Sequence, residues 1–502
     1  MKKKTIYILG LIMTLGFMSC DDYLDVTPDN RASLDSDVKV KELLTSAYPE
    51  LGYGLFSFSM SDNARDKGIG HMSDMSNTEG YFWKDFTSTT QDSPSGFWDA
   101  CYNCIATANQ SLKYIEENKV DNKIPDNLLP FYGEALLIRA YNHFMLVNFF
   151  GKHYNPDTAS EDLGVPYVTE VEDVVFKNYK RSTVQEVYDF IETDFKEGIK
   201  YIDDTSYDSP KFHMNYAASC TFISRFYLYK REWTKVVEYA TEALGNNTYA
   251  KLRDLTGKYG DLGVNEQAAE YSKSTEAANF LITSKISIWF HYFQATLRYT
   301  YNAEIEDLLY KNIFLTDGKE WAQASANFGT TDPVIVKWGF FFKQSGINAD
   351  VGYYYAISPD IVAEEALFNR IEANIMLRDY TSAEDDFNKY FEKRITGYDD
   401  TNKISEAKID AHYKDNSRAD SPLNPNYDLD EKQRTYLNCV IDTRRREFIY
   451  NGLRWFDIKR FNMKVIHNID EGSPIDLTEN DNRKVLQIPI AAQLFGIQPN
   501  AR

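Results

Sequence analysis

Residues 216–244 read YAASCTFISRFYLYKREWTKVVEYATEAL and predict two helices, 216–230 and 232–244, joined by a short turn. The turn REWTKV at 231–236 recurs as RDYTSA at 378–383. Each copy has a basic residue, an acid, an aromatic residue and a threonine, with a smaller apolar residue opening the next helix. We expect the ring to fill space between helices and the threonine to cap the second helix. A chance match is the alternative, but helical periodicity on both sides favours a repeated hairpin.

Apolar residues at helical spacing predict further helices around this hairpin. The segments are 97–118 and 128–150, which form the first strong pair, a helix that starts at Ser182, and a second hairpin that begins near Pro359. The repeated turn resembles that of tetratricopeptide hairpins. The expected fold is all-α. Its helical scaffold covers residues 38–247 and 359–395, with a C-terminal segment over residues 439–502.

Three stretches interrupt the helical pattern. Residues 54–94 and 396–429 are rich in polar and turn-forming residues and predict loops. Residues 248–358 form a large irregular insertion with many aromatic residues. Because long insertions on a regular scaffold often carry function, we expect ligand-contacting residues there and in the aromatic island at residues 81–83.

The N-terminus has the pattern of a secretory signal. Lys2 to Lys4 precede an uncharged apolar run that ends at Met18, followed by Ser19 and Cys20. A cysteine after a small residue resembles the lipobox of bacterial lipoproteins, which predicts removal of residues 1–19 and a lipid on Cys20. Cleavage elsewhere, with Cys20 an ordinary residue, is the alternative. The apolar run is shorter than the roughly 20 residues that a spanning helix needs.

Composition excludes several classes of protein. The 502 residues carry a net charge of −20, which makes nucleic acid an improbable partner. A hydrophobic content of 43% with 15% aromatic residues excludes general disorder. A calcium ion is possible among so many acids, but no EF-hand spacing is present, so we assign no metal and no cofactor, and whether calcium is bound stays open.

Four cysteines follow Cys20. Cys101 and Cys104 form a CxxC pair within a predicted helix, without the strand of a thioredoxin-like site or a second CxxC for zinc. We therefore expect small buried thiols here rather than redox or metal chemistry. Whether Cys101, Cys104, Cys220 and Cys439 form disulfides is open, because an exported protein could pair them.

Residues 444–461 read RRREFIYNGLRWFDIKRF. Gly452 predicts a break between two helical pieces, and Asp457 has the spacing to pair with Arg454 and Arg460 on one helix face. A salt-bridged surface helix is one interpretation. The Trp455-Phe456 pair among these charges favours a segment that docks into the body of the protein.

This segment resembles the C-terminal motif of the SusD/RagB family of outer-membrane nutrient-uptake lipoproteins. The motif matches at Arg445, Arg446, Glu447, Gly452, Arg454, Trp455, Phe456, Asp457, Lys459 and Arg460, and departs at Asn451, where the family has glutamate. The ending LQIP at 486–489 with GIQPN at 496–500, the leader from Cys20 to Pro28, and the first helix pair at Trp98, Asn109, Glu134, Arg139 and Phe149–Gly151 also fit the family.

The resemblance implies one SusD-like domain over residues 20–502, built from four tetratricopeptide-like hairpins and a loop-rich insertion. It further implies a lipid anchor in the outer membrane, exposure to the cell exterior, and a partner β-barrel, a SusC-type TonB-dependent transporter. Members capture oligosaccharides, or in some cases peptides, and are not enzymes.

For sugar capture, exposed aromatic platforms with a few polar groups are needed. The candidate ligand-binding residues are Tyr81, Trp83, Trp289, Tyr299 and Trp321, with core packing as the alternative for each. Trp98, Trp233 and Trp455 are assigned to structure. An exported glycan hydrolase is a further alternative, although the sequence has no nucleophile elbow, HExxH or phosphate loop.

Overall fold

A computed structural model describes residues 34, 36–172, 177–290, 293–311, 313, 318–323, 325–344, 351–414 and 421–502. The predicted signal peptide and Cys20 lie outside these residues. In the part of the chain that is described, no helix has the length and apolar character needed to cross a membrane.

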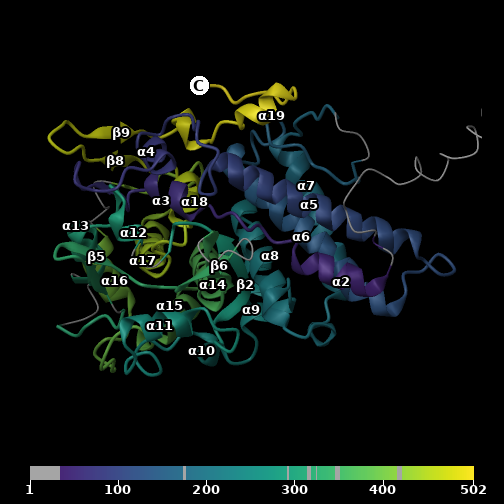
Figure 1. The fold of residues 1–502 in the computed structure, drawn as a ribbon. Helices are drawn as coiled ribbons and strands as arrows, with labels where there is room; N and C mark the ends of the chain where they lie inside the picture. The colour runs from purple at the N-terminus through teal and green to yellow at the C-terminus, as the bar shows by residue number, and fades with distance from the viewer. Residues whose placement is uncertain are drawn as a thin grey trace, which may run out of the picture.

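The first half of the described chain contains the long helices of the scaffold. In chain order its elements are α2 (Asp37–Thr45), α3 (Gly54–Ser59), β1 (Arg65–Asp66), α4 (Met75–Tyr81), α5 (Pro94–Glu117), α6 (Leu129–Phe150), α7 (Val184–Gly198), α8 (Tyr216–Lys230) and α9 (Trp233–Leu244). Consecutive helices pack on each other, α5 on α6, α6 on α7 and α8 on α9, as Figure 1 shows. The predicted all-α, hairpin-based scaffold is confirmed.

The insertion contains short helices and strands. They are α10 (Thr248–Lys251), α11 (Val264–Tyr271), β2 (Asn279–Ile286), α12 (Phe293–Thr296), β3 (Tyr299–Thr300), α13 (Ala303–Glu306), a π-helical turn (Asp307–Lys311), β4 (Ala326–Phe328), β5 (Asp332–Val334), β6 (Phe340–Gln344) and β7 (Gly352–Val362). Strands β2, β7 and β6 form an antiparallel sheet in that order, so the insertion has more regular structure than its sequence indicates.

The C-terminal part returns to helices. Its elements are α14 (Ala363–Met376), α15 (Tyr380–Glu392), α16 (Glu406–Tyr413), α17 (Glu431–Glu447), α18 (Arg454–Arg460), β8 (Val465–His467), β9 (Ile475–Leu477) and α19 (Ile490–Leu494). Helix α14 packs on α9, α15 and α17, which joins the second hairpin to the first and to the C-terminal segment.

The two repeated turns have the same backbone geometry. Arg231 and Arg378 both adopt the left-handed conformation with a φ of 64°. The predicted threonine cap is wrong, because the acid stands at the N-cap position instead. The Asp379 side chain accepts a hydrogen bond from Ser382 N, whereas Glu232 makes no side-chain cap.

Two of the predicted loops contain helices. Residues 54–94 form α3 and α4, and residues 396–429 include α16. Helix α3 reads GLFSFS and is almost wholly buried, so it lacks the polar face that reveals a helix in a sequence. Asp74 caps α4, which packs against α3.

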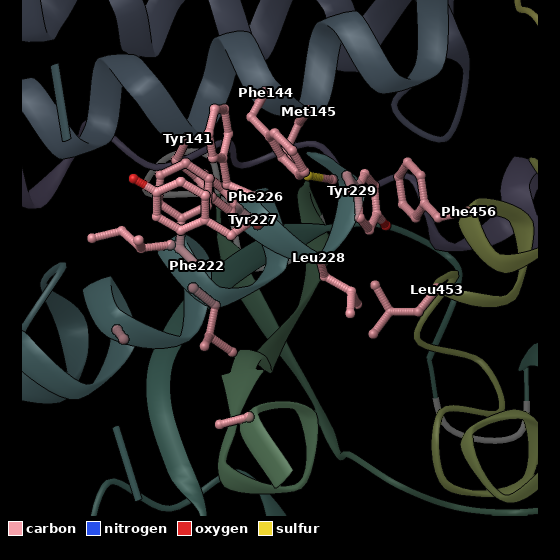
Figure 2. Close-up of a cluster of buried hydrophobic side chains, with 14 of the residues drawn as sticks. Tyr141, Phe144, Met145, Phe222, Phe226, Tyr227, Leu228, Tyr229, Leu453 and Phe456 are labelled. Carbon is pink, nitrogen blue, oxygen red and sulfur yellow. The ribbon is translucent and has the colours of Figure 1, made fainter. Parts of the chain in front are cut away.

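Aromatic rings join the scaffold to the C-terminal segment, as Figure 2 shows. Phe144 of α6 lies 5.6 Å from Phe222 and 5.2 Å from Tyr229 of α8, between ring centroids. Tyr229 in turn lies 6.4 Å from Phe456 of α18. These rings belong to the main core, and a second buried cluster, which includes Trp289, is built mostly from residues of the insertion.

The 444–461 segment is buried, as docking into the body requires. Gly452 has a φ of 76° between α17 and α18, which confirms the predicted break. A Cβ there would lie 2.4 Å from Ser57 Oγ, so close approach also requires glycine. The surface-helix interpretation is wrong, since every residue of α18 is buried.

Buried ion pairs fix this segment in place. Arg460 pairs with Asp457 at 2.7 Å, as its spacing predicts. Arg454 instead donates two hydrogen bonds, of 2.8 and 2.7 Å, to the carboxylate of Asp62. Asp62 follows α3, so the motif ties the end of the chain to its beginning.

The four cysteines are buried and unpaired. Burial raises the pKa of Cys104, Cys220 and Cys439 to about 12. The prediction of small buried thiols is confirmed, and these thiols stay protonated at neutral pH.

Candidate functional site

The hairpin of β6 and β7 exposes a cluster of aromatic rings. Phe340, Phe342 and Tyr354 of the hairpin and Phe293 of α12 are between 37% and 44% exposed. Phe290, which is 1% exposed, lies beneath them. We call these five residues the aromatic face. Large apolar side chains grouped at the surface mark interaction sites more often than single ones do.

Strand register explains why these rings share one side of the hairpin. Phe340 pairs with Ala356, and Phe342 pairs with Tyr354. Successive side chains of a strand point to opposite sides, so residues 340, 342 and 354 lie together. Phe341 pairs with Tyr355 on the other side. Gly352 permits the close packing, because a Cβ there would lie 2.6 Å from Phe342 Cζ.

The rings contact one another in a continuous set. Phe290 and Phe340 stack with centroids 5.2 Å apart, and Phe340 lies 5.5 Å from Tyr354. Tyr354 lies 5.3 Å from Phe342 and 6.1 Å from Phe293. Contacts between rings restrict their rotation, so the aromatic face is a preorganised apolar platform.

Polar groups border the aromatic face. Lys67 donates hydrogen bonds to Ala295 O of α12, at 2.5 Å, and to Asp332 of β5, at 3.0 Å. His71 Nε2 lies 3.2 Å from the same carboxylate. Gln344 at the end of β6 is exposed and lies on the same side of the hairpin as Phe340 and Phe342. The exposed Gln344 amide can hydrogen-bond hydroxyl groups of a ligand whose apolar surface lies on the rings, whereas the Lys67 side chain is only 4% exposed.

The enclosed space nearby is too small for a sugar. A cavity of about 50 Å³ lies behind the sheet and is lined in part by Lys285, Trp289, Trp338 and Ala356. That volume holds a few water molecules at most. A ligand of sugar size therefore does not fit inside this cavity.

Four of the five residues predicted from the sequence are buried. Tyr81, Trp83, Trp289 and Tyr299 are at most 4% exposed, so the expectation that they present exposed platforms is wrong. Tyr81 stacks on Tyr299 at 4.3 Å. Trp83 Nε1 donates to Met60 O, and Trp289 Nε1 to Tyr450 O, each at 2.9 Å. Burial of Trp83 and Trp289 is favoured, because their rings pack inside the protein and their indole N–H groups have hydrogen-bond acceptors there.

The fifth predicted residue lies apart from these. Trp321 is half-buried, 6.1 Å from Tyr390 of α15 and 6.4 Å from Tyr310. The structure thus brings Tyr81 and Tyr299 together, and Trp83 near them through His467, on which both Tyr81 and Trp83 stack. As ligand contacts, the five residues remain a prediction.

Sequence reasoning missed the aromatic face. A signal was present: the runs FFFKQ at 340–344 and GYYYA at 352–356 flank SGINADV at 345–351, which contains turn-forming residues. Two β-prone runs around such a link indicate a hairpin. Among the described residues, no group of three or more His, Cys, Asp or Glu side chains is arranged to hold a metal ion.

Comparisons with known proteins agree with this architecture. Residues 22–228 match the model of the family SusD-like_3, described as "Starch-binding associating with outer membrane". A search of curated proteins gives no match.

Solved structures match over nearly the whole chain. A SusD superfamily protein from Bacteroides thetaiotaomicron is 17% identical, with a TM-score of 0.65 over 93% of this chain and 99% of that one. A SusD superfamily protein from Bacteroides vulgatus is 17% identical, with a TM-score of 0.66 over 92% and 97%. A SusD-like carbohydrate binding protein from the same species is 16% identical, with a TM-score of 0.62 over 91% and 96%.

Proposed function

We propose that this chain is a SusD-like protein, a surface-exposed lipoprotein that binds a nutrient glycan and delivers it to a SusC-type TonB-dependent transporter. The description of the matching family as starch-binding and the carbohydrate-binding relative support a glycan as the ligand class. On this proposal the protein is a receptor and not an enzyme.

The observation that carries the proposal is the aromatic face. Its four exposed rings offer flat apolar surfaces, and Gln344 offers a hydrogen-bonding group at its border. Sugar rings have apolar C–H faces and hydroxyl edges, so this arrangement matches an oligosaccharide laid across the hairpin.

The anchor and the location are part of the same proposal. Residues 1–19 would be removed, and Cys20 would carry the lipid that holds a single domain, residues 20–502, on the outer membrane facing the exterior. The basic, apolar and small-residue pattern before Cys20 supports this. Mass spectrometry of the processed N-terminus and labelling of intact cells test it.

A peptide ligand is the second candidate. Strand β6 is an edge strand of its sheet, and an extended peptide can add to such an edge through backbone hydrogen bonds. The aromatic face next to that edge could then hold apolar side chains of the peptide.

Binding to a panel of soluble ligands tests the proposal. A soluble version of the chain that begins after Cys20 is run in native gels containing starch, xylan, mannan, levan or arabinan, and is titrated with mixed peptides. We expect retardation by at least one polysaccharide, and a loss of roughly three- to tenfold in affinity for Phe340→Ala or Tyr354→Ala, since one ring contact contributes about 0.5–1.5 kcal/mol.

Phe212→Ala is the matched control, because Phe212 is 38% exposed and lies outside the aromatic face. Binding only of peptides would favour the second candidate. Polysaccharide binding that survives both aromatic-face substitutions would place the site elsewhere. Release of reducing ends from the polysaccharide would restore the hydrolase alternative.

A further inference from the structure

Two segments far apart in the chain meet in the aromatic face. Residues 287–290 with the start of α12 supply Phe290 and Phe293, and residues 337–342 supply Phe340 and Phe342. Neither segment belongs to the helical scaffold. Their relative position therefore depends on what holds each of them to it.

Asp92 holds the first segment. Its carboxylate accepts hydrogen bonds from the Ser287 hydroxyl and from Ile288 N, the latter at 2.9 Å. Ser287 Oγ also accepts a hydrogen bond from Trp289 N at 2.8 Å. Asp92 is 2% exposed and directly precedes Ser93, the N-cap of α5. The residues just before Phe290 are thus fastened to a scaffold helix.

Lys337 holds the second segment. Its ammonium donates hydrogen bonds to the backbone oxygen of Glu447, at the end of α17, and to Asn451 Oδ1, the latter at 3.0 Å. Lys337 is 3% exposed and lies three positions before Phe340. The start of β6 is thus fastened to the C-terminal segment, at the one motif position, Asn451, that departs from the family pattern.

We propose that Asp92 and Lys337 are positioning residues of the aromatic face, each fixing one of the two segments that meet in the Phe290–Phe340 stack. This inference rests on the proposed function, because the aromatic face that Asp92 and Lys337 position is the proposed ligand surface. Trp338 Nε1 donates a hydrogen bond to Trp289 O at 3.4 Å, which links the two segments directly.

Chemistry distinguishes substitutions that keep these anchors from those that remove them. Asn at position 92 still accepts from Ile288 N and can donate to the Ser287 hydroxyl, whereas Ala at position 92 does neither. Met at position 337 fills the space of lysine but has no N–H donor. Asp92→Asn is therefore the conservative variant, and Asp92→Ala and Lys337→Met remove the anchors.

Two matched controls exist in the chain. Asp379 also accepts from a backbone N–H and a hydroxyl, both of Ser382, but at the start of α15. Lys459 is a buried lysine like Lys337, and donates to Asn148 O and Gly151 O at the end of α6. Burial lowers the pKa of both lysines to about 7, so Lys459→Met removes a comparable group elsewhere.

Hydrogen–deuterium exchange without ligand is the first test. We expect Asp92→Ala to raise exchange about tenfold in residues 285–290, and Lys337→Met to raise it about tenfold in residues 335–344, with α5 and α6 unchanged. Asp92→Asn, Asp379→Ala and Lys459→Met should leave both segments at the wild-type rate. Unchanged exchange in Asp92→Ala and Lys337→Met, or equal effects from Lys459→Met, would overturn the proposal.

Affinity for the polysaccharide that most retards the wild type is the second test. We expect Asp92→Ala and Lys337→Met to weaken binding by roughly tenfold, and Asp92→Asn to bind with the affinity of the wild type. A wild type that binds no polysaccharide would contradict the proposed function, while the exchange result would still decide the positioning role. Normal affinity in Asp92→Ala despite increased exchange would show that the two segments do not align the ligand surface.

Discussion

Phe290 and Phe340 stack with their ring centroids 5.2 Å apart and their planes 18° from parallel. The two residues come from different segments of the insertion, one after β2 and one in β6. Their contact forms the buried end of the aromatic face, and Tyr354 continues it to the surface. The ligand surface proposed for this protein is therefore a tertiary feature and not a property of one loop.

The scaffold supports that surface through the C-terminal segment. Glu447 closes α17 and accepts hydrogen bonds from Arg394 and Tyr390 of the second hairpin through its carboxylate, and from Lys337 through its backbone oxygen. Arg394 also pairs with Glu364 of α14 at 3.0 Å. Because these groups are buried together, the hairpins, the motif and the base of β6 are fixed as one unit.

Trp83→Ala is expected to destabilise the protein, whereas the same substitution at an exposed ring would leave its stability nearly unchanged. The ring is 4% exposed, stacks 4.3 Å from His467 and donates to Met60 O. Loss of a buried tryptophan costs about 3–5 kcal/mol. Thermal unfolding measures this, with the half-buried Trp233→Ala as control. A melting temperature equal to the wild type would contradict the burial of Trp83.

Arg460→Met should cost about 3–5 kcal/mol, because it leaves the buried carboxylate of Glu372 without its partner and removes one partner of Asp457. Arg460 donates hydrogen bonds of 2.6 and 3.0 Å to Glu372, which is 0% exposed. Adding Glu372→Gln removes the uncompensated charge and should recover part of the loss. Urea unfolding of the single and double variants gives the coupling energy. Additive effects would mean that the pair does not link α14 to α18.

The long helices and the break at Gly452 could be predicted from the sequence because their signals are local. Apolar periodicity sets a helix, and glycine permits the φ of 76° that separates α17 from α18. The repeated turn was recognisable for the same reason. The threonine cap failed because Asp379, two positions before Thr381, already occupies the capping position.

Burial of single aromatic residues was not predictable in this way. Tyr81 is buried because it stacks on Tyr299 and His467, which lie far along the chain. Composition cannot distinguish such a ring from Phe342, which a neighbouring strand holds at the surface. The choice between core and platform is made by tertiary partners, and these become visible only in the structure.

The four cysteines should be unreactive in the folded protein. Cys101 and Cys104 lie within α5, and burial raises the pKa of the Cys104 thiol to about 12, so no thiolate forms at neutral pH. We expect a thiol-reactive chromogenic disulfide to label none of them in the soluble chain that begins after Cys20, and all four in urea. Labelling in the native state, or fewer than four thiols in urea without reductant, would contradict the free buried state.

Asp92 gives the pH dependence with the clearest sign. Burial, with a smaller contribution from the negative charge of Asp74, raises its pKa from 3.8 to about 7. The folded state therefore holds this proton at a pH where the unfolded chain has lost it. The stability contributed by the protonated group is fully present below about pH 4 and is lost as the pH rises to about 7.

Asp92→Asn has no such titration, so its unfolding free energy should rise relative to the wild type between pH 4 and pH 7, by up to about 4 kcal/mol. Urea unfolding of both proteins at pH 4.5, 6 and 8 measures the difference, and Asp379→Asn, at an exposed helix cap, is the control. A difference that stays constant across this range, or that changes in the opposite direction, would show that the Asp92 carboxyl does not titrate in the buried position beside Ser287 that the structure gives it.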